Sequence, residues 1–117
     1  MHRWRMFELD KTWILRYTSR AIDDFQSLDK SQRRQVQTAI EKVLQNPLPQ
    51  SEGGYGKPLR GRLAGCFKIK LLDAGIRILY VIKREQDQMV IILIGMRRDV
   101  KFYELAVDRL RAFRSEN

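Results

Sequence analysis

Apolar side chains recur at two different spacings along the first part of this chain. Trp13 to Tyr17 is short, aromatic and β-branched, which predicts a strand. Thr18 follows it and is a suitable N-cap for a short helix. The apolar face predicted for that helix consists, at helical spacing, of Ile22, Phe25 and Leu28.

A second helix is predicted directly after the first. Asp29, with Gln32 three residues later, resembles a capping box, in which each side chain bonds the other residue's backbone. The apolar stripe of this helix consists of Val36, Ile40, Val43 and Leu44, and the helix is ended by Pro47 and Pro49. The glycine-rich segment Ser51–Gly56 lacks the Gly-Lys-Ser/Thr of a phosphate-binding loop, so we interpret it as a plain flexible connection.

Three strands are predicted in the second half of the chain. Cys66 to Leu72 alternates, with Lys68 and Lys70 on the face opposite its apolar residues. Ile76 to Ile82 follows after a short turn. Met89 to Gly95 is continuously apolar, as expected of a central strand that is covered on both faces.

A last helix completes the predicted domain. Asp99 can cap it, and its apolar stripe consists of Phe102, Leu105, Ala106, Leu110 and Phe113. The element order is therefore β-α-α-β-β-β-α, and the short connections imply antiparallel neighbours. We predict a single α+β domain over residues 13–117, with an antiparallel sheet packed by an N-terminal helical hairpin and a C-terminal helix, preceded by an extension of residues 1–12.

The distribution of charge adds a functional clue. The chain has 117 residues, with 23 Lys and Arg against 14 Asp and Glu, a net charge of +9. Residues 57–101 hold 11 of the basic and 4 of the acidic side chains, so most of the excess lies in the predicted strands. This concentration favours a face that binds a polyanion, with nucleic acid the best candidate, over a surface that only maintains solubility.

The side-chain inventory excludes several kinds of chemistry. The single cysteine, Cys66, cannot form an intramolecular disulfide, and the single histidine, His2, leaves Ser–His catalysis, Cys–His catalysis and histidine-based zinc sites without residues. No apolar run approaches the roughly 20 residues that span a bilayer, and acidic residues interrupt the N-terminus where a secretory signal is apolar. We therefore expect a cytoplasmic protein with no metal, no cofactor and no membrane partner.

Lys68 and Lys70 are the most informative local feature. Two ammonium groups on one strand face raise each other's cost of protonation, so the pKa of at least one is expected below that of a free lysine, which allows it to act as a base. The alternative is a solvated strand face whose lysines oppose edge-to-edge aggregation. If the hairpin connection spans Asp73 to Ile76, Leu72 pairs with Arg77, and Arg77 then shares the lysines' face.

Two further residues complete a candidate site, because sheet ends and helix starts commonly converge on one rim. They are Arg97, after the buried strand, and Tyr103, near the start of the last helix. Cations suit a reaction in which negative charge develops on phosphate oxygens, and an aromatic ring suits the stacking of a nucleobase. RNA supplies its own 2′-OH nucleophile, so a metal-independent ribonuclease that releases a 2′,3′-cyclic phosphate and a 5′-OH fits this set.

Five short motifs stand in a fixed order along the chain. They are LRG at Leu59–Gly61, CFKIKL at Cys66–Leu71, GIRILY at Gly75–Tyr80, an apolar strand ending Gly95-Met96-Arg97, and a tyrosine six residues after that arginine. In this order and spacing they resemble the RelE toxins of the RelE/ParE superfamily of type II toxin–antitoxin systems. The resemblance covers roughly Trp13 to Leu110. Met96 departs from the family pattern, because it replaces the basic residue often found before the catalytic arginine.

The resemblance implies a ribosome-dependent mRNA endoribonuclease, or mRNA interferase, that cuts mRNA in the A site and inhibits translation. The implied partners are a cognate antitoxin that neutralises it, the ribosome with its 16S rRNA, mRNA, and operator DNA only through the antitoxin complex. Two alternatives share the fold. One is a ParE-like toxin that inhibits DNA gyrase, and the other is a non-catalytic module that acts with an antitoxin on operator DNA.

The same resemblance assigns roles to individual residues. It implies Lys68 and Lys70 as base and phosphate stabiliser, Arg77 as the transition-state arginine, Arg97 as the residue that protonates the leaving group, and Tyr103 as the ring that stacks on the substrate nucleotide. The basic residues predicted to bind RNA beside them are Lys57, Arg60, Arg62 and Arg98.

Overall fold

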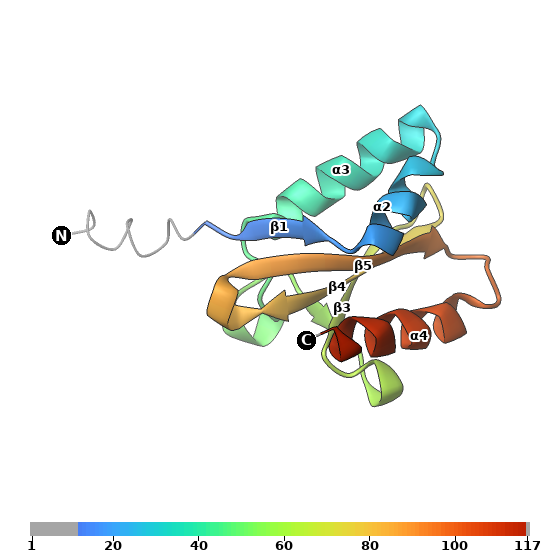
Figure 1. Ribbon diagram of the computed structural model, residues 1–117. Coiled ribbons are helices and arrows are strands. Elements are labelled where there is room, and N and C mark those ends of the chain that lie inside the picture. The colour runs from blue at the N-terminus through green and yellow to red at the C-terminus, as the bar shows by residue number, and fades with distance from the viewer. Residues whose placement is uncertain (1–11, 117) are drawn as a thin grey trace.

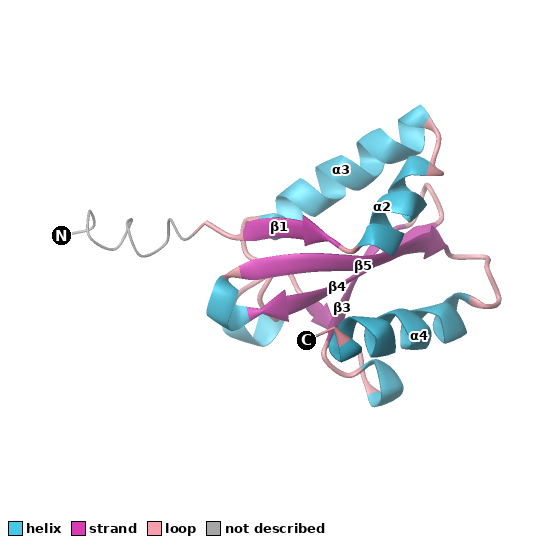
Figure 2. Ribbon diagram, in the orientation of Figure 1, coloured by secondary structure: helices cyan, strands magenta, loops and turns pink. Residues whose placement is uncertain are grey.

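The computed structural model describes residues 12–116 and contains every predicted helix and strand in the predicted order (Figures 1 and 2). The main elements are β1 (Ile14–Tyr17), α2 (Ser19–Gln26), α3 (Lys30–Leu44), β2 (Lys57–Pro58), β3 (Cys66–Leu71), β4 (Ile76–Lys83), β5 (Gln88–Met96) and α4 (Phe102–Ser115). The two-residue β2 was not predicted, because only its pairing with β3 defines it. The predicted extension lies, up to residue 11, outside the described residues. No helix within residues 12–116 is long and apolar enough to cross a membrane.

Both predicted helix starts in the N-terminal half are confirmed. The Thr18 side chain accepts a hydrogen bond from the backbone N–H of Ala21 and caps α2. Asp29 and Gln32 form the complete capping box of α3, with the Gln32 N–H donating to Asp29 over 2.7 Å and the Asp29 N–H donating to Gln32 over 3.0 Å. These bonds satisfy donors that the first turn of a helix otherwise leaves unpaired.

The five strands form one sheet in the order β1-β5-β4-β3-β2. The pairs β5–β4, β4–β3 and β3–β2 are antiparallel, as the short connections predicted. The prediction of a wholly antiparallel sheet is wrong at one edge, because β1 runs parallel to β5. These two strands are separated by most of the chain, so no short connection fixes their relative direction.

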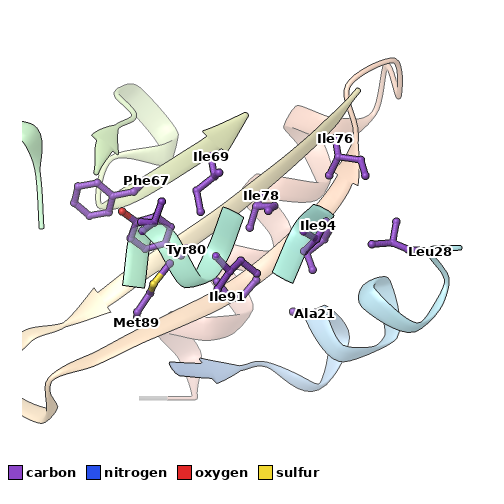
Figure 3. Packing of buried hydrophobic residues seen from close by; sticks show 13 residues of the cluster. Ala21, Leu28, Phe67, Ile69, Ile76, Ile78, Tyr80, Met89, Ile91 and Ile94 are labelled. Carbon is purple, nitrogen blue, oxygen red and sulfur yellow. The ribbon is translucent and has the colours of Figure 1, made fainter. Parts of the chain in front are cut away.

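Helices cover both faces of the sheet (Figure 1). One buried cluster, drawn in part in Figure 3, packs the sheet against α2 and α3, and a second packs it against α4. The strand β5 lies between them and is buried from Met89 to Ile94, which explains its continuous apolar run. Two predicted core positions are wrong: Ile22 is 44% exposed and Leu105 is 38% exposed. Their places on α2 and α4 are taken by Ala21 and Val107.

An ion pair closes the edge of β5 beyond the end of β1. The Asp24 carboxylate, from α2, accepts a hydrogen bond from the Ile94 N–H over 3.0 Å. The Arg109 guanidinium, from α4, donates to the Ile92 carbonyl over 2.8 Å and to Asp24 over 2.9 Å. The two side chains thus supply the hydrogen bonds that a neighbouring strand would make, and they join the helical layers of the two faces around the sheet edge.

The glycine-rich segment is tightly packed, so its interpretation as a plain flexible connection is wrong. The N–H groups of Tyr55 and Gly56 donate to the carbonyls of Asn46 and Leu48, both over 2.9 Å. A Cβ atom at Gly54 would lie 2.1 Å from the Leu48 carbonyl oxygen, so no larger residue fits there. The sequence showed the glycines but not the backbone that approaches them.

Candidate active site

The hairpin of β3 and β4 places Arg77 directly opposite Lys70. The predicted pairing of Arg77 with Leu72 is wrong by two residues, because the connection runs from Leu72 to Gly75, where the positive φ of Gly75 (67°) closes the turn. A shift of two residues leaves each side chain on its predicted face. Lys68, Lys70 and Arg77 therefore share the face that α4 covers.

These cations line a cavity of about 410 Å³ between the sheet and the start of α4. The cavity brings together five of the predicted functional residues, namely Arg60, Lys68, Lys70, Arg77 and Tyr103. Its apolar walls include Leu79 from β4 and Phe102 from α4. Lys68 and Arg77 are half-buried, whereas Lys70 and Tyr103 are exposed at the opening. The cavity thus has a cationic floor and an aromatic ring at its rim.

Arg77 is held against the ring of Phe102. The guanidinium carbon lies 5.8 Å from the ring centroid, a cation–π distance. Gly95, opposite Arg77 on β5, makes this contact possible, because a Cβ there would lie 2.8 Å from the ring. Within residues 12–116 the buried Arg77 Nε has no hydrogen-bond partner, so the ring of Phe102 is the contact that the structure gives this guanidinium. Sequence reasoning assigned Phe102 only to the core and Gly95 only to a motif.

Lys70 has the perturbed titration that the lysine pair predicted. Its neighbour Lys68 is the main reason that the pKa of Lys70 lies below the ordinary lysine value. Partial desolvation lowers it further, and the charges of Arg77 and Arg97 act in the same direction. Lys70 therefore loses its proton more readily than a lysine in water and can accept one from a substrate nearer to neutral pH.

The other predicted functional residues, Arg97 included, do not line this cavity. Arg97 and Arg98 line a separate cavity of about 560 Å³ at the end of the β3–β4 hairpin, where the Arg97 N–H donates to the Gly75 carbonyl over 2.7 Å. Lys57 lies opposite Lys68 on β2. Arg62 lines a groove beside the C-terminal turns of α4.

Asp99 differs from its prediction. It does not cap α4, which begins at Phe102 without a side-chain cap. Its carboxylate instead accepts a hydrogen bond from the Lys101 N–H over 2.9 Å, and its carbonyl accepts one from the Phe102 N–H over 3.0 Å. Asp99 therefore shapes the turn that delivers Phe102 and Tyr103 to the cavity.

In the described part of the chain, neither the cysteine nor the acidic residues suggest a metal centre. Burial raises the pKa of the Cys66 thiol to about 11, so it is protonated and unreactive at neutral pH. Within residues 12–116, no three His, Cys, Asp or Glu side chains are grouped so that they could hold a metal ion.

Comparison with known proteins agrees with this architecture. The sequence model of one family, described as the ParE toxin of the type II toxin–antitoxin system parDE, matches residues 15–101. An Escherichia coli RelE-like toxin protein is 31% identical over 98 residues, covering 83% of this chain and 96% of that protein. The mRNA interferase toxin RelE of Escherichia coli K12 is 28% identical over 98 residues, covering 84% of this chain and 97% of RelE.

A solved structure shows the same fold. It contains an Escherichia coli RelE variant with two arginines changed to alanine, in complex with a peptide of the antitoxin RelBc. Its RelE chain is 26% identical, with a TM-score of 0.64, and the match covers 82% of this chain and 95% of that one. The chain therefore belongs to the RelE/ParE superfamily of type II toxins and, within it, is a RelE-type toxin.

Proposed function

We propose that this protein is an mRNA interferase: an endoribonuclease that cuts mRNA in the ribosomal A site and is neutralised by a cognate antitoxin. The observation that carries the proposal is the position of Lys70, beside Lys68 and opposite Arg77, in a cavity with Tyr103 at its rim. The name of the similar Escherichia coli RelE, an mRNA interferase, supports the same activity. Because the proposed substrate is mRNA on ribosomes, the proposal also locates the protein in the cytoplasm.

The proposed reaction needs only the atoms of the RNA and these side chains. Neutral Lys70 takes the proton of a ribose 2′-OH, whose oxygen forms a bond to the adjacent phosphorus. The bond from phosphorus to the 5′-oxygen breaks, and that oxygen takes up a proton. The products are a 2′,3′-cyclic phosphate and a 5′-OH, with no net gain or loss of protons.

The remaining residues stabilise the charge and position the substrate. Arg77, which is half-buried in the cavity lining, faces the phosphate oxygens on which charge develops. In this proposal Arg97 stands near the leaving 5′-oxygen as its proton source. Tyr103 is 50% exposed, which leaves its ring free to stack on a nucleobase.

Dependence on the ribosome follows from the weakness of the base. The described residues of the site include no histidine, and the nucleophile belongs to the RNA. Much of the rate must therefore come from substrate positioning, which the ribosome provides by holding the mRNA in the A site. The net charge of +9 favours docking on ribosomal RNA, so association is expected to weaken steeply as salt rises.

Programmed ribosomes incubated with the protein test the proposal. The expected result is mRNA cut in the A site, with a 2′,3′-cyclic phosphate end, and cleavage lost in Arg77→Ala. Arg20→Ala, which removes an exposed charge from α2 on the other side of the sheet, serves as the matched control and should cut normally. Intact mRNA with a fully toxic Arg77→Ala variant would refute the proposal.

Inhibition of DNA gyrase is the second candidate, because the matching family model is described as a ParE toxin. Gyrase-dependent DNA breaks in cells expressing the protein, together with uncut mRNA, would establish it instead. The same cells co-expressing the antitoxin should grow normally under either activity. Operator binding by the toxin–antitoxin complex without any toxicity would leave the non-catalytic alternative.

A further inference from the structure

Lys68 and Lys70 also line a second cavity, at the edge of β3 that faces away from β4. This cavity has a volume of about 270 Å³ and lies between β3, α3 and the glycine-rich loop. The other polar residues of its lining are Lys42, Gln50, Tyr55 and Lys57. Within residues 12–116 no carboxylate lines it, so the cavity suits an anionic ligand, and its volume is close to the lower limit of about 300 Å³ for small-molecule pockets.

Tyr55 is an exposed aromatic ring on a rigid support. Its side chain is 45% exposed, and the Lys42 ammonium lies 5.6 Å from the ring centroid. Its own N–H is bonded to the Asn46 carbonyl, and its neighbours Gly54 and Gly56 pack too tightly against the backbone of residues 46–48 to accept a Cβ. A ring held in this way loses little conformational freedom when a planar group stacks on it.

Cations connect this ring to the first cavity. Lys57 lies directly opposite Lys68 in the β2–β3 pairing, on the same face of the sheet. Lys68 and Lys70 belong to the linings of both cavities. The two lysines therefore form a ridge, with Tyr103 on one side and Tyr55 on the other. Proteins that bind a single nucleic-acid strand commonly combine cations, which contact its backbone, with aromatic rings on which successive bases stack.

We propose that the second cavity is a nucleotide subsite, in which Tyr55 stacks on the base next to the cleaved step while Lys42 and Lys57 bind its phosphate. The RNA strand crosses the ridge of Lys68 and Lys70, so its scissile phosphate lies over the lysines and consecutive bases rest on the two tyrosines. This inference rests on the proposed ribonuclease function and adds a substrate-positioning residue, Tyr55, to it.

Crosslinking tests where the RNA lies. Ribosomes are programmed with mRNA that carries a 2′-deoxy nucleotide at the cleaved step, which prevents cleavage, and 5-iodouridine at one position at a time. Irradiation with the full-length toxin should crosslink Tyr55 to one nucleotide beside the cleaved step, as identified by mass spectrometry. Crosslinks from neither flanking nucleotide to Tyr55 or Lys57 would overturn the subsite.

Kinetics tests what the contact does. Tyr55→Ala should raise the toxin concentration for half-maximal cleavage by about 5- to 150-fold, the range found when a stacking ring is removed, with little change in the rate at saturation. Tyr55→Phe should restore parental behaviour. Ile22→Ala, which trims a similarly exposed side chain on α2, is the matched control.

The outcomes separate this inference from the proposed function. If the parent cuts mRNA and Tyr55→Ala cuts it with the same concentration dependence, the subsite is wrong and the ribonuclease stands. If the parent cuts no mRNA, the ribonuclease proposal fails, and absence of the crosslink rejects the subsite as well. If Tyr55→Ala weakens only antitoxin binding, the cavity binds protein and the RNA subsite is rejected.

Discussion

Replacement of Gly95 by alanine is expected to impair the proposed mRNA cleavage far more than the stability of the fold. The added Cβ would lie 2.8 Å and 2.9 Å from two ring atoms of Phe102. Carbon atoms are in optimal contact at about 3.5 Å or more, so the ring must retreat by roughly 0.7 Å. Phe102 is buried and begins α4, so this displacement moves both the ring under Arg77 and the adjacent Tyr103.

The magnitudes of the two effects differ. Overpacking costs about 1–3 kcal/mol, and loss of a flexible glycine from a strand returns about 0.5–1 kcal/mol. We therefore expect the free energy of unfolding to fall by about 1–2 kcal/mol. A misplacement approaching 1 Å in a catalytic site costs about 100-fold in rate, so single-turnover cleavage of A-site mRNA should fall by about that factor.

Two measurements on the same preparations show whether Gly95→Ala affects cleavage more than stability. Urea unfolding gives the change in stability, and cleavage on programmed ribosomes gives the change in rate. Val36→Ala is the matched control, since it weakens the fully buried core beneath α3, on the face away from the cavity. If Gly95→Ala cuts mRNA no more slowly than Val36→Ala, the contact between Gly95 and Phe102 does not set the geometry of the site.

Three further substitutions test other parts of the structure. Because Lys68 lowers the pKa of Lys70, Lys68→Ala should raise that pKa and move the rising limb of the pH–rate profile for cleavage to higher pH. A limb that does not move argues against Lys70 as the base. Arg109→Met leaves Asp24 without its cation in a largely buried position and should lower unfolding stability by about 3 kcal/mol in urea titrations, with a loss below 1 kcal/mol contradicting the role of the pair. Asp29→Ala removes the cap of α3 and should cost about 1 kcal/mol by thermal unfolding, whereas Asp29→Asn should cost little.

The predictable part of this fold depends on residues that are close in sequence. The capping box of Asp29 and Gln32 and the alternation around Lys68 and Lys70 are properties of one helical turn and one strand, so the sequence displays them directly. The parallel pairing of β1 and the exposure of Ile22 depend on how distant segments meet. Contacts between distant segments of this kind leave no pattern in the local sequence.

The candidate site divides in the same way. The cations were found because their strand faces follow from alternation, and an error of two residues in the pairing of Arg77 did not change its face. The ring beneath Arg77 was missed, because Phe102 has the spacing of an ordinary core residue and only the approach of Gly95 gives it a second role. The rigid support of Tyr55 was missed for a similar reason.

The ion pair of Asp24 and Arg109 makes α4 the cover of a strand edge. Arg109 is the part of α4 that bonds the Ile92 carbonyl, and it also neutralises the carboxylate that bonds the Ile94 N–H. Any event that lifts α4 from the sheet would therefore remove one wall of the cavity. The same movement would expose the Ile92 carbonyl and the Ile94 N–H on β5 to pairing with another strand. The amide proton of Ile94 is the natural reporter of that movement, since its hydrogen exchange should quicken when the helix departs.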